Sequence, residues 1–261
     1  MVVMEFRAGT VLRKLTIVAV GIVMLAVAWA GESGPLSKTG LSSSLSGGGV
    51  SPVSDAEFKD LPDEAGRKRV ALSFDLDRGE VQFREILRSL ESENARATFF
   101  VAGSWAALHP AEVKLIAQAG HEVGILGHRQ IDLTRLEPGA IRSELRNAKL
   151  AVSAAMNRNP RLFRPPLGRS NESVSREATG LGLTPVMWTV DSHDSQGVSA
   201  QYISRRLFSR AAPGAVFRLH AGDAARETAG ALPDLIRELR LRGYQVVTVS
   251  ELNDDPPSTR R

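Results

Sequence analysis

Short apolar strands alternate with amphipathic helices along most of this 261-residue chain, and that alternation constrains the fold more than any other feature. Strands that are joined through helices pair in parallel by right-handed crossovers, so we expect an α/β sheet or barrel. One such domain of this size can bury a complete core. The predicted strands are 70–74, 97–102, 121–126, 162–164, 185–190, 215–219 and 244–249, and the predicted helices lie around 83–90, 110–120, 138–156 and 232–239.

The chain divides into four parts. Residues 1–30 contain the uncharged apolar run Leu15 to Ala30, which three basic residues precede. That order predicts an exported chain whose first segment is either a signal anchor or a cleaved signal peptide, so that the protein is membrane-anchored on the outer face or secreted. Residues 31–68 are rich in Gly and Ser and predict a flexible linker, residues 69–252 form the folded domain, and residues 253–261 are a polar tail.

Composition excludes several classes of function. Lys and Arg number 33 against 29 Asp and Glu, the charges are dispersed, and only 5% of residues are aromatic, so we expect no nucleic-acid partner. The chain has no cysteine, which excludes disulfides, thiolate metal sites and a cysteine nucleophile. The expected partner at the N-terminus is the membrane.

Polar residues follow five of the predicted strands. In parallel α/β folds, the chemistry lies on the loops after the carboxyl ends of the strands. Taken singly, each position has a structural explanation, such as a turn-forming aspartate or a packed histidine. Together they indicate a site made of Asp75-Leu76-Asp77, Gly127-His128, Arg164-Pro165-Pro166, Asp191 to Asp194, and His220.

Four of these segments, SFDLDRG, RPPLG, WTVDSHD and LHAG, resemble in order and spacing the motifs of the polysaccharide deacetylases with NodB homology, carbohydrate esterase family four. The resemblance covers residues 69–252 and is closest to the PdaB-type sporulation proteins. It implies a single distorted (β/α) barrel that removes acetyl groups from N-acetylated sugars. The implied substrate and partner is a cell-wall glycan of the peptidoglycan type, and the implied setting is spore or cell-wall maturation.

The resemblance also implies catalytic roles. Asp75 takes the position of the general base with Arg164 as its partner, and His220 takes the position of the general acid with Asp194 as its orienting group. Amide hydrolysis needs these types, because a water must be activated and the leaving amine must receive a proton. The implied substrate pocket consists of Leu219, Pro165 and Leu167.

The family binds a divalent metal, commonly zinc, through one aspartate and two histidines. Here the second carboxylate is displaced to Asp77, and the two histidine positions fall on Leu126 and Gln130. Leucine cannot bind a metal, and the glutamine carbonyl is a poor ligand for zinc. A zinc site would therefore have to be rebuilt around Asp77 and His128.

Two functions stay open at this point. The first is a deacetylase that uses Asp75, Arg164, Asp194 and His220 with a weak or rebuilt metal site. The second is a degenerate member of the same fold that binds cell-wall glycan or a partner protein without hydrolysis. A glycosidase is disfavoured, because Asp75 and Asp77 are too close in sequence to flank a glycosidic bond.

Overall fold

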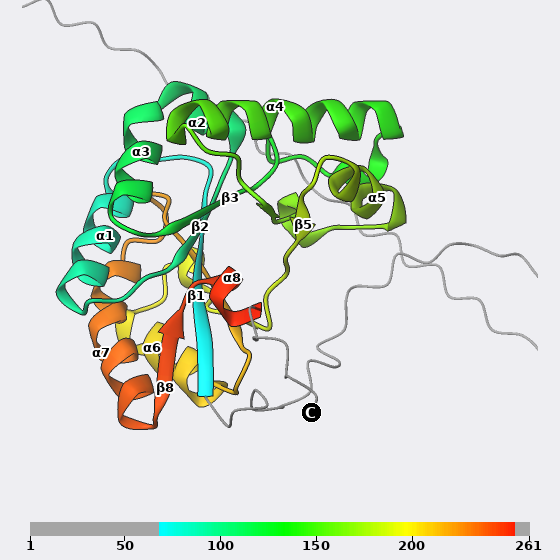
Figure 1. Ribbon diagram of the computed structural model, residues 1–261. Coiled ribbons are helices and arrows are strands. Elements are labelled where there is room, and N and C mark those ends of the chain that lie inside the picture. Colours follow the sequence, from blue (N-terminus) through cyan, green and yellow to red (C-terminus); the bar gives the residue numbers. More distant parts are fainter. Residues whose placement is uncertain (1–67, 254–261) are drawn as a thin grey trace, which may run out of the picture. The chain divides into compact units, whose positions relative to one another are not determined.

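Strand β1 (Lys68–Leu76) lies at the centre of the parallel sheet in the computed structural model, which describes residues 68–253 (Figure 1). Its first half pairs with β8, its second half with β2, and its middle with β7. The predicted N-terminal segment, nearly all of the linker and most of the tail lie outside the described residues. Within 68–253, no helix combines the length and the apolar run that crossing a bilayer requires.

The other strands are short and all pair in parallel. They are β2 (Thr98–Val101), β3 (Glu122–Ile125), β4 (Leu162–Phe163), β5 (Thr184–Pro185), β6 (Val190–Asp191), β7 (Val216–His220) and β8 (Tyr244–Val247). The helices are α1 (Gln82–Ser92), α2 (Gly103–Leu108), α3 (Pro110–Gln118), α4 (Pro138–Met156), α5 (Glu172–Gly180), α6 (Ala200–Ser209), α7 (Thr228–Leu241) and α8 (Val249–Asn253). Single 3₁₀ turns are η1 (Leu133–Arg135), η2 (Pro166–Gly168) and η3 (Asp194–Gln196).

The sheet is curled into an open half-barrel, and the connection between β5 and β6 shows why. The strand order is β5-β4-β3-β2-β1-β7-β6, so β5 and β6 stand at opposite ends of this path. Seven strands laid flat would separate those ends by about 29 Å. Five residue steps from Pro185 to Val190 span at most about 18 Å. The sheet must therefore curl, although β5 and β6 do not pair in the described part of the chain and the barrel is not closed.

Each face of the curled sheet carries its own apolar cluster. The larger cluster, which we call the outer core, includes Phe74, Phe99, Phe217 and Leu219 and side chains of the helices that cover the outer face (Figure 1). The smaller cluster, which we call the inner apolar cluster, consists of Ala71, Phe100, Leu126, Leu162, Val186 and Val249. Because strand side chains alternate between faces, the polar residues Ser73 and Asp75 share the face of Ala71 rather than that of Phe74.

Most predicted elements are confirmed with ends that differ by a few residues, and two of the differences have a clear cause. The helix expected at 138–156 has these bounds, whereas the strand expected at 185–190 breaks into β5 and β6. The break occurs because Val186 N still bonds to β4, while Thr189 N already bonds to Val216 O beside β7. The strand expected to reach Val249 ends at Val247, since α8 begins at Val249.

Candidate active site

Strand register brings the predicted catalytic residues together. Asp75 in β1 is the register partner of His220 in β7, and Ser73 is the partner of Arg218. Arg218 is in turn the partner of Asp191 in β6. In β7, Arg218 and His220 are half-buried, while Phe217 and Leu219 between and beside them are buried in the outer core. The polar cluster therefore lies on one face, at the carboxyl ends of three adjacent strands.

Asp75 and Arg164 form a buried ion pair. Arg164 Nη1 donates to Asp75 Oδ1 at 2.8 Å, and Arg164 Nη2 donates to Ser73 Oγ at 2.8 Å. The Ser73 hydroxyl in turn donates a hydrogen bond to the Phe217 carbonyl at 2.7 Å. The Arg164 side chain is fully buried over the Phe100 ring, with 4.0 Å from guanidinium carbon to ring centroid. Its Nε atom has no hydrogen-bond partner among the described residues.

A second guanidinium, which the sequence analysis did not predict, holds the other oxygen of Asp75. Arg218 Nε donates to Asp75 Oδ2 at 2.8 Å, and Arg218 Nη1 donates to Asp191 Oδ2 at 3.0 Å. The same guanidinium lies over the Trp188 ring at 4.2 Å. Asp75 is thus clamped from both sides by arginine, and Arg218 links it to a second carboxylate.

His220 and Asp194 form the expected dyad. His220 Nδ1 lies 2.7 Å from Asp194 Oδ1, and the backbone amide of His220 donates to Asp194 Oδ2 at 2.8 Å. Thr228 Oγ1 also donates to Oδ2, at 2.7 Å. Asp194 is fully buried, whereas 22% of the His220 side chain is exposed. With Nδ1 turned to Asp194, Nε2 is the ring nitrogen left to meet a ligand.

The charges of the cluster shift the pKa values in opposite directions. Burial alone would raise the pKa of Asp75, but Arg164, Arg218 and His220 outweigh it and hold that pKa below its ordinary value. Burial alone would lower the pKa of His220, but the hydrogen bond and charge of Asp194 raise it. Asp75 is therefore an ionised carboxylate at neutral pH, and the imidazolium form of His220, which can donate a proton, is favoured.

The expected metal ligands do not come together. Asp77 lies in the bend after β1, beyond the strand whose alternation would place it on the face of Asp75, and its carboxylate accepts from the Arg78 guanidinium at 2.9 Å. Leu126 is buried in the inner apolar cluster beside Phe100. Within residues 68–253, no group of three or more His, Cys, Asp and Glu side chains is placed to hold a metal ion.

His128 packs against helix α2 and belongs to no group of three or more side chains in residues 68–253 that could hold a metal ion. A methyl group built on Gly103 at the start of α2 would approach His128 Nδ1 to 2.6 Å, so the ring lies directly against that helix. Its Nδ1 atom is buried and has no hydrogen-bond partner in the described part of the chain. Gln130 lies in the same bend. The residues described here therefore do not fit the zinc site that the family implies.

The three residues predicted for the substrate pocket have different environments. Leu219 is fully buried in the outer core, on the opposite face of β7 from His220, so that prediction is wrong. Pro165 is buried directly after Arg164, at the edge of the cluster. Leu167 is 55% exposed in a left-handed backbone conformation with φ 60°, so it offers an apolar side chain to solvent. Leu167 and Pro165 stay predictions.

Arg218 and Thr228 are the participants that the sequence analysis missed. The signal for Arg218 was alternation, since in VFRLH the residue two before His220 must share its face. Asp191 had already been noted as the start of the loop that ends at Asp194. For Thr228 we find no sequence signal, because its hydroxyl reaches Asp194 from the first turn of α7 across the tertiary structure.

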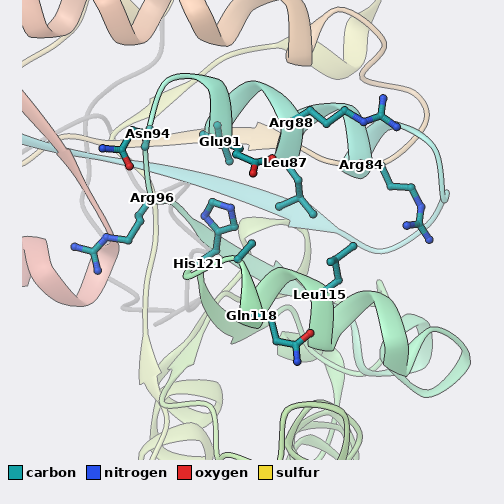
Figure 2. Close-up of a pocket in the computed structure, with 12 residues that line it drawn as sticks. Arg84, Leu87, Arg88, Glu91, Asn94, Arg96, Leu115, Gln118 and His121 are labelled. Carbon is teal, nitrogen blue, oxygen red and sulfur yellow. The ribbon is translucent and has the colours of Figure 1, made fainter.

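A separate pocket of about 530 Å³ lies between α1 and α3 (Figure 2). Its lining includes Arg84, Arg88 and Leu115 from the two helices, and His121 just before β3. His121 and Arg96 precede β3 and β2, so this pocket is at the amino ends of the parallel strands. Asp75 and His220 are at the opposite ends, and none of the four residues of the predicted catalytic set lines the pocket.

Comparison with known proteins finds similarity to polysaccharide deacetylases. The family model for polysaccharide deacetylases matches residues 63–186. A peptidoglycan N-acetylglucosamine deacetylase of Bacillus cereus is 30% identical over 189 residues, which are 71% of this chain and 68% of that protein. The peptidoglycan N-acetylglucosamine deacetylase PgdA of Listeria monocytogenes is 30% identical over 199 residues. Those cover 76% of this chain but only 42% of the relative's length.

Among solved structures, a protein of Bacillus anthracis described as a CE4 family pseudoenzyme is similar to this chain with a TM-score of 0.69. The two are 29% identical, and the match covers 74% of this chain and 67% of that one. The half-barrel is therefore shared with a protein described as a pseudoenzyme, while these two sequence relatives are named deacetylases.

Proposed function

Because this chain belongs to the polysaccharide deacetylase family, we propose that it removes acetyl groups from N-acetylated sugars of a peptidoglycan-type glycan. The observation that carries the proposal is the register pairing of Asp75 with His220, which places a carboxylate and an imidazole side by side at one end of the sheet. The names of the relatives support the substrate class.

The proposed chemistry divides between the two halves of the cluster. Asp75, held by Arg164, is the acceptor for the proton of the attacking water. His220 donates a proton from Nε2 to the leaving amine, and Asp194 keeps the ring in the orientation and charge state for that donation. Because guanidinium groups take both oxygens of Asp75, its basicity is low, and we expect slow turnover.

The experiment is acetate release from N-acetylglucosamine oligomers and from peptidoglycan fragments, followed by mass spectrometry. The proteins compared are the full chain, His220→Gln, and His109→Gln as a matched change outside the cluster. We expect the first substitution to reduce the rate at least about 100-fold, which is typical for loss of a general acid. Equal rates in the chain and in His220→Gln would refute the proposal.

A second function, glycan binding without hydrolysis, is favoured by two specific observations. The described residues do not fit the metal site of the family, and the structurally similar Bacillus anthracis protein is described as a pseudoenzyme. Retention of the chain on insoluble peptidoglycan separates the two functions. Retention that depends on His220 without acetate release would establish binding alone.

The proposal extends to location. The basic flank and apolar run of residues 1–30, with the Gly/Ser-rich residues 31–68 behind them, support an exported domain held at the outer face of the membrane or released from it. Cell fractionation with external protease tests this, since an exported domain is digested in intact cells. A role in spore-wall maturation is the narrower form of the proposal and is supported by the resemblance to PdaB-type proteins. Loss of the protein would then alter the spore-wall glycan.

A further inference from the structure

Among the residues that the structure describes, Arg218 is the group whose side chain hydrogen-bonds to two of the three carboxylates in the cluster. Its Nε and Nη1 atoms donate to Asp75 and Asp191 at 2.8 and 3.0 Å, and its side chain is 20% exposed. Neighbouring strands fix this arrangement, because Arg218 is the register partner of both Ser73 and Asp191. Trp188 covers the guanidinium at 4.2 Å and packs against Gly168, which limits its movement.

The three carboxylates and the three cationic groups that pair with them balance without any added ion, and the Arg206 guanidinium, which donates to the Asp191 carbonyl at 2.7 Å, adds a further positive charge beside them. Each carboxylate has a cationic partner within 3.0 Å, and the negative and positive groups are equal in number when the imidazole is protonated: Asp75, Asp191 and Asp194 against Arg164, Arg218 and His220. A divalent metal placed here would add two positive charges to a half-buried, neutral set. It would also have to compete with guanidinium groups for the carboxylate oxygens of Asp75 and Asp191.

We propose that the Arg218 guanidinium is the resident cation of this site, bridging the carboxylates of Asp75 and Asp191 and positioning Asp75 without a divalent metal. The inference deepens the proposed function, because it assigns metal independence to the same cluster. It makes Arg218 a positioning residue that acts on the ligand through Asp75 and Asp191. It also explains how the domain keeps Asp75 ordered although the described residues offer no metal site.

The test compares metal uptake by the full chain with uptake by Arg218→Met, which removes the charge but keeps an unbranched side chain. After treatment with a chelator, each protein is titrated with ZnCl₂ in a calorimeter and melted with and without the metal. We expect the full chain to ignore zinc, and Arg218→Met to bind it at least about tenfold more tightly because two carboxylates have lost their cation. Zinc should then raise the melting temperature of that variant alone.

Two further variants are controls. Arg218→Lys keeps the charge and should, like the full chain, not bind zinc, a result that a merely structural role for the fork-shaped guanidinium would not produce. Arg205→Met makes the same chemical change on the exposed face of α6 and should have no effect. Stoichiometric zinc binding by the full chain would overturn the proposal, and so would zinc binding that Arg218→Met leaves unchanged.

If Arg218→Met does not fold, the full chain and Arg218→Lys decide the question. Retention on peptidoglycan and acetate release by both should be the same in chelator and in added ZnCl₂. A rise of about tenfold or more with zinc would contradict a resident arginine cation. Failure of the proposed function has a different signature, because a chain that neither retains nor hydrolyses glycan refutes that function whatever its zinc affinity.

Discussion

At the scale of single residues, Asp194 controls the charge of His220. Asp194→Asn keeps the size of the side chain and removes its charge, so the pKa of His220 should fall, because the hydrogen bond and the charge of Asp194 are what raise it against burial. NMR titration of the His220 ring measures this directly. Asp234→Asn, an exposed change in α7, is the control. An unchanged His220 titration in Asp194→Asn would show that the dyad does not exist in solution.

Thr228 is a second residue that we expect to stabilise the fold through a single contact. Its buried hydroxyl donates to Asp194 Oδ2 at 2.7 Å. Thr228→Val replaces that hydroxyl by a methyl group and leaves one carboxylate oxygen with one donor fewer, so we expect a loss of about 1–2 kcal/mol in the free energy of unfolding. Urea denaturation measures the loss. Thr184→Val on the exposed edge strand should change it by less than about 0.5 kcal/mol.

At the scale of elements, the topology of the sheet could be predicted from the sequence, but the short helices could not. Parallel pairing alone places the residues after β1, β4, β6 and β7 at one edge, and this is why Asp75, Arg164 and His220 meet as expected. Besides α8, three short helices were missed, α2, α5 and α6, although Asn171 and Ser199 cap α5 and α6 with side-chain hydrogen bonds. Runs of six to ten residues carry too little periodicity to be recognised.

The misplaced end of β8 and the failed metal site have different causes. Thr248 and Glu251 form a reciprocal capping box, in which Thr248 N donates to the Glu251 carboxylate and Glu251 N donates to the Thr248 hydroxyl. The spacing Thr-x-x-Glu was readable in the sequence. The fate of Asp77 and His128 was not, because it depends on where β1 ends and on the contact of the His128 ring with Gly103 in α2.

Helix α1 gives a prediction at this same scale. No side chain of its own caps it, and instead the Asp223 carboxylate accepts from the backbone amides of Glu80, Val81 and Gln82 at 3.3, 3.0 and 3.1 Å. Asp223→Ala should therefore cost about 1 kcal/mol of unfolding free energy, as loss of an N-cap does. Chemical denaturation checks this, with Asp234→Ala as the control. Equal stability of both variants would mean that water replaces the carboxylate.

For the whole molecule, two histidines on opposite edges of the sheet act on stability in opposite senses. His121 is buried beneath the Phe99 ring and accepts from Ala97 N through Nδ1. Burial, aided by the charge of Arg96, lowers its pKa from 6.5 to about 4. The pKa of His220 at the other edge is raised by Asp194 against its burial.

The direction of each effect of pH on stability depends on whether the folded or the unfolded chain binds the proton more tightly. The unfolded chain protonates His121 near pH 6.5 and the folded chain only near pH 4, so acidification favours unfolding. The cost between pH 6.5 and pH 5 is about 2 kcal/mol, since one pKa unit corresponds to about 1.4 kcal/mol. The stabilisation from His220 is fully present below its ordinary pKa of 6.5 and is lost as the pH rises through its raised folded value.

The stability of the protein should therefore pass through a maximum near neutral pH, with one histidine responsible for each side. Urea denaturation between about pH 5 and pH 8 stays above the range in which the carboxylates with lowered pKa values are protonated. His121→Gln, which keeps an acceptor for Ala97 N, should flatten the acid side only, and His220→Gln the alkaline side only. His109→Gln should leave both slopes intact. If His121→Gln retained the full acid slope, burial of His121 could not be the cause of acid instability, and the carboxylates would have to carry it.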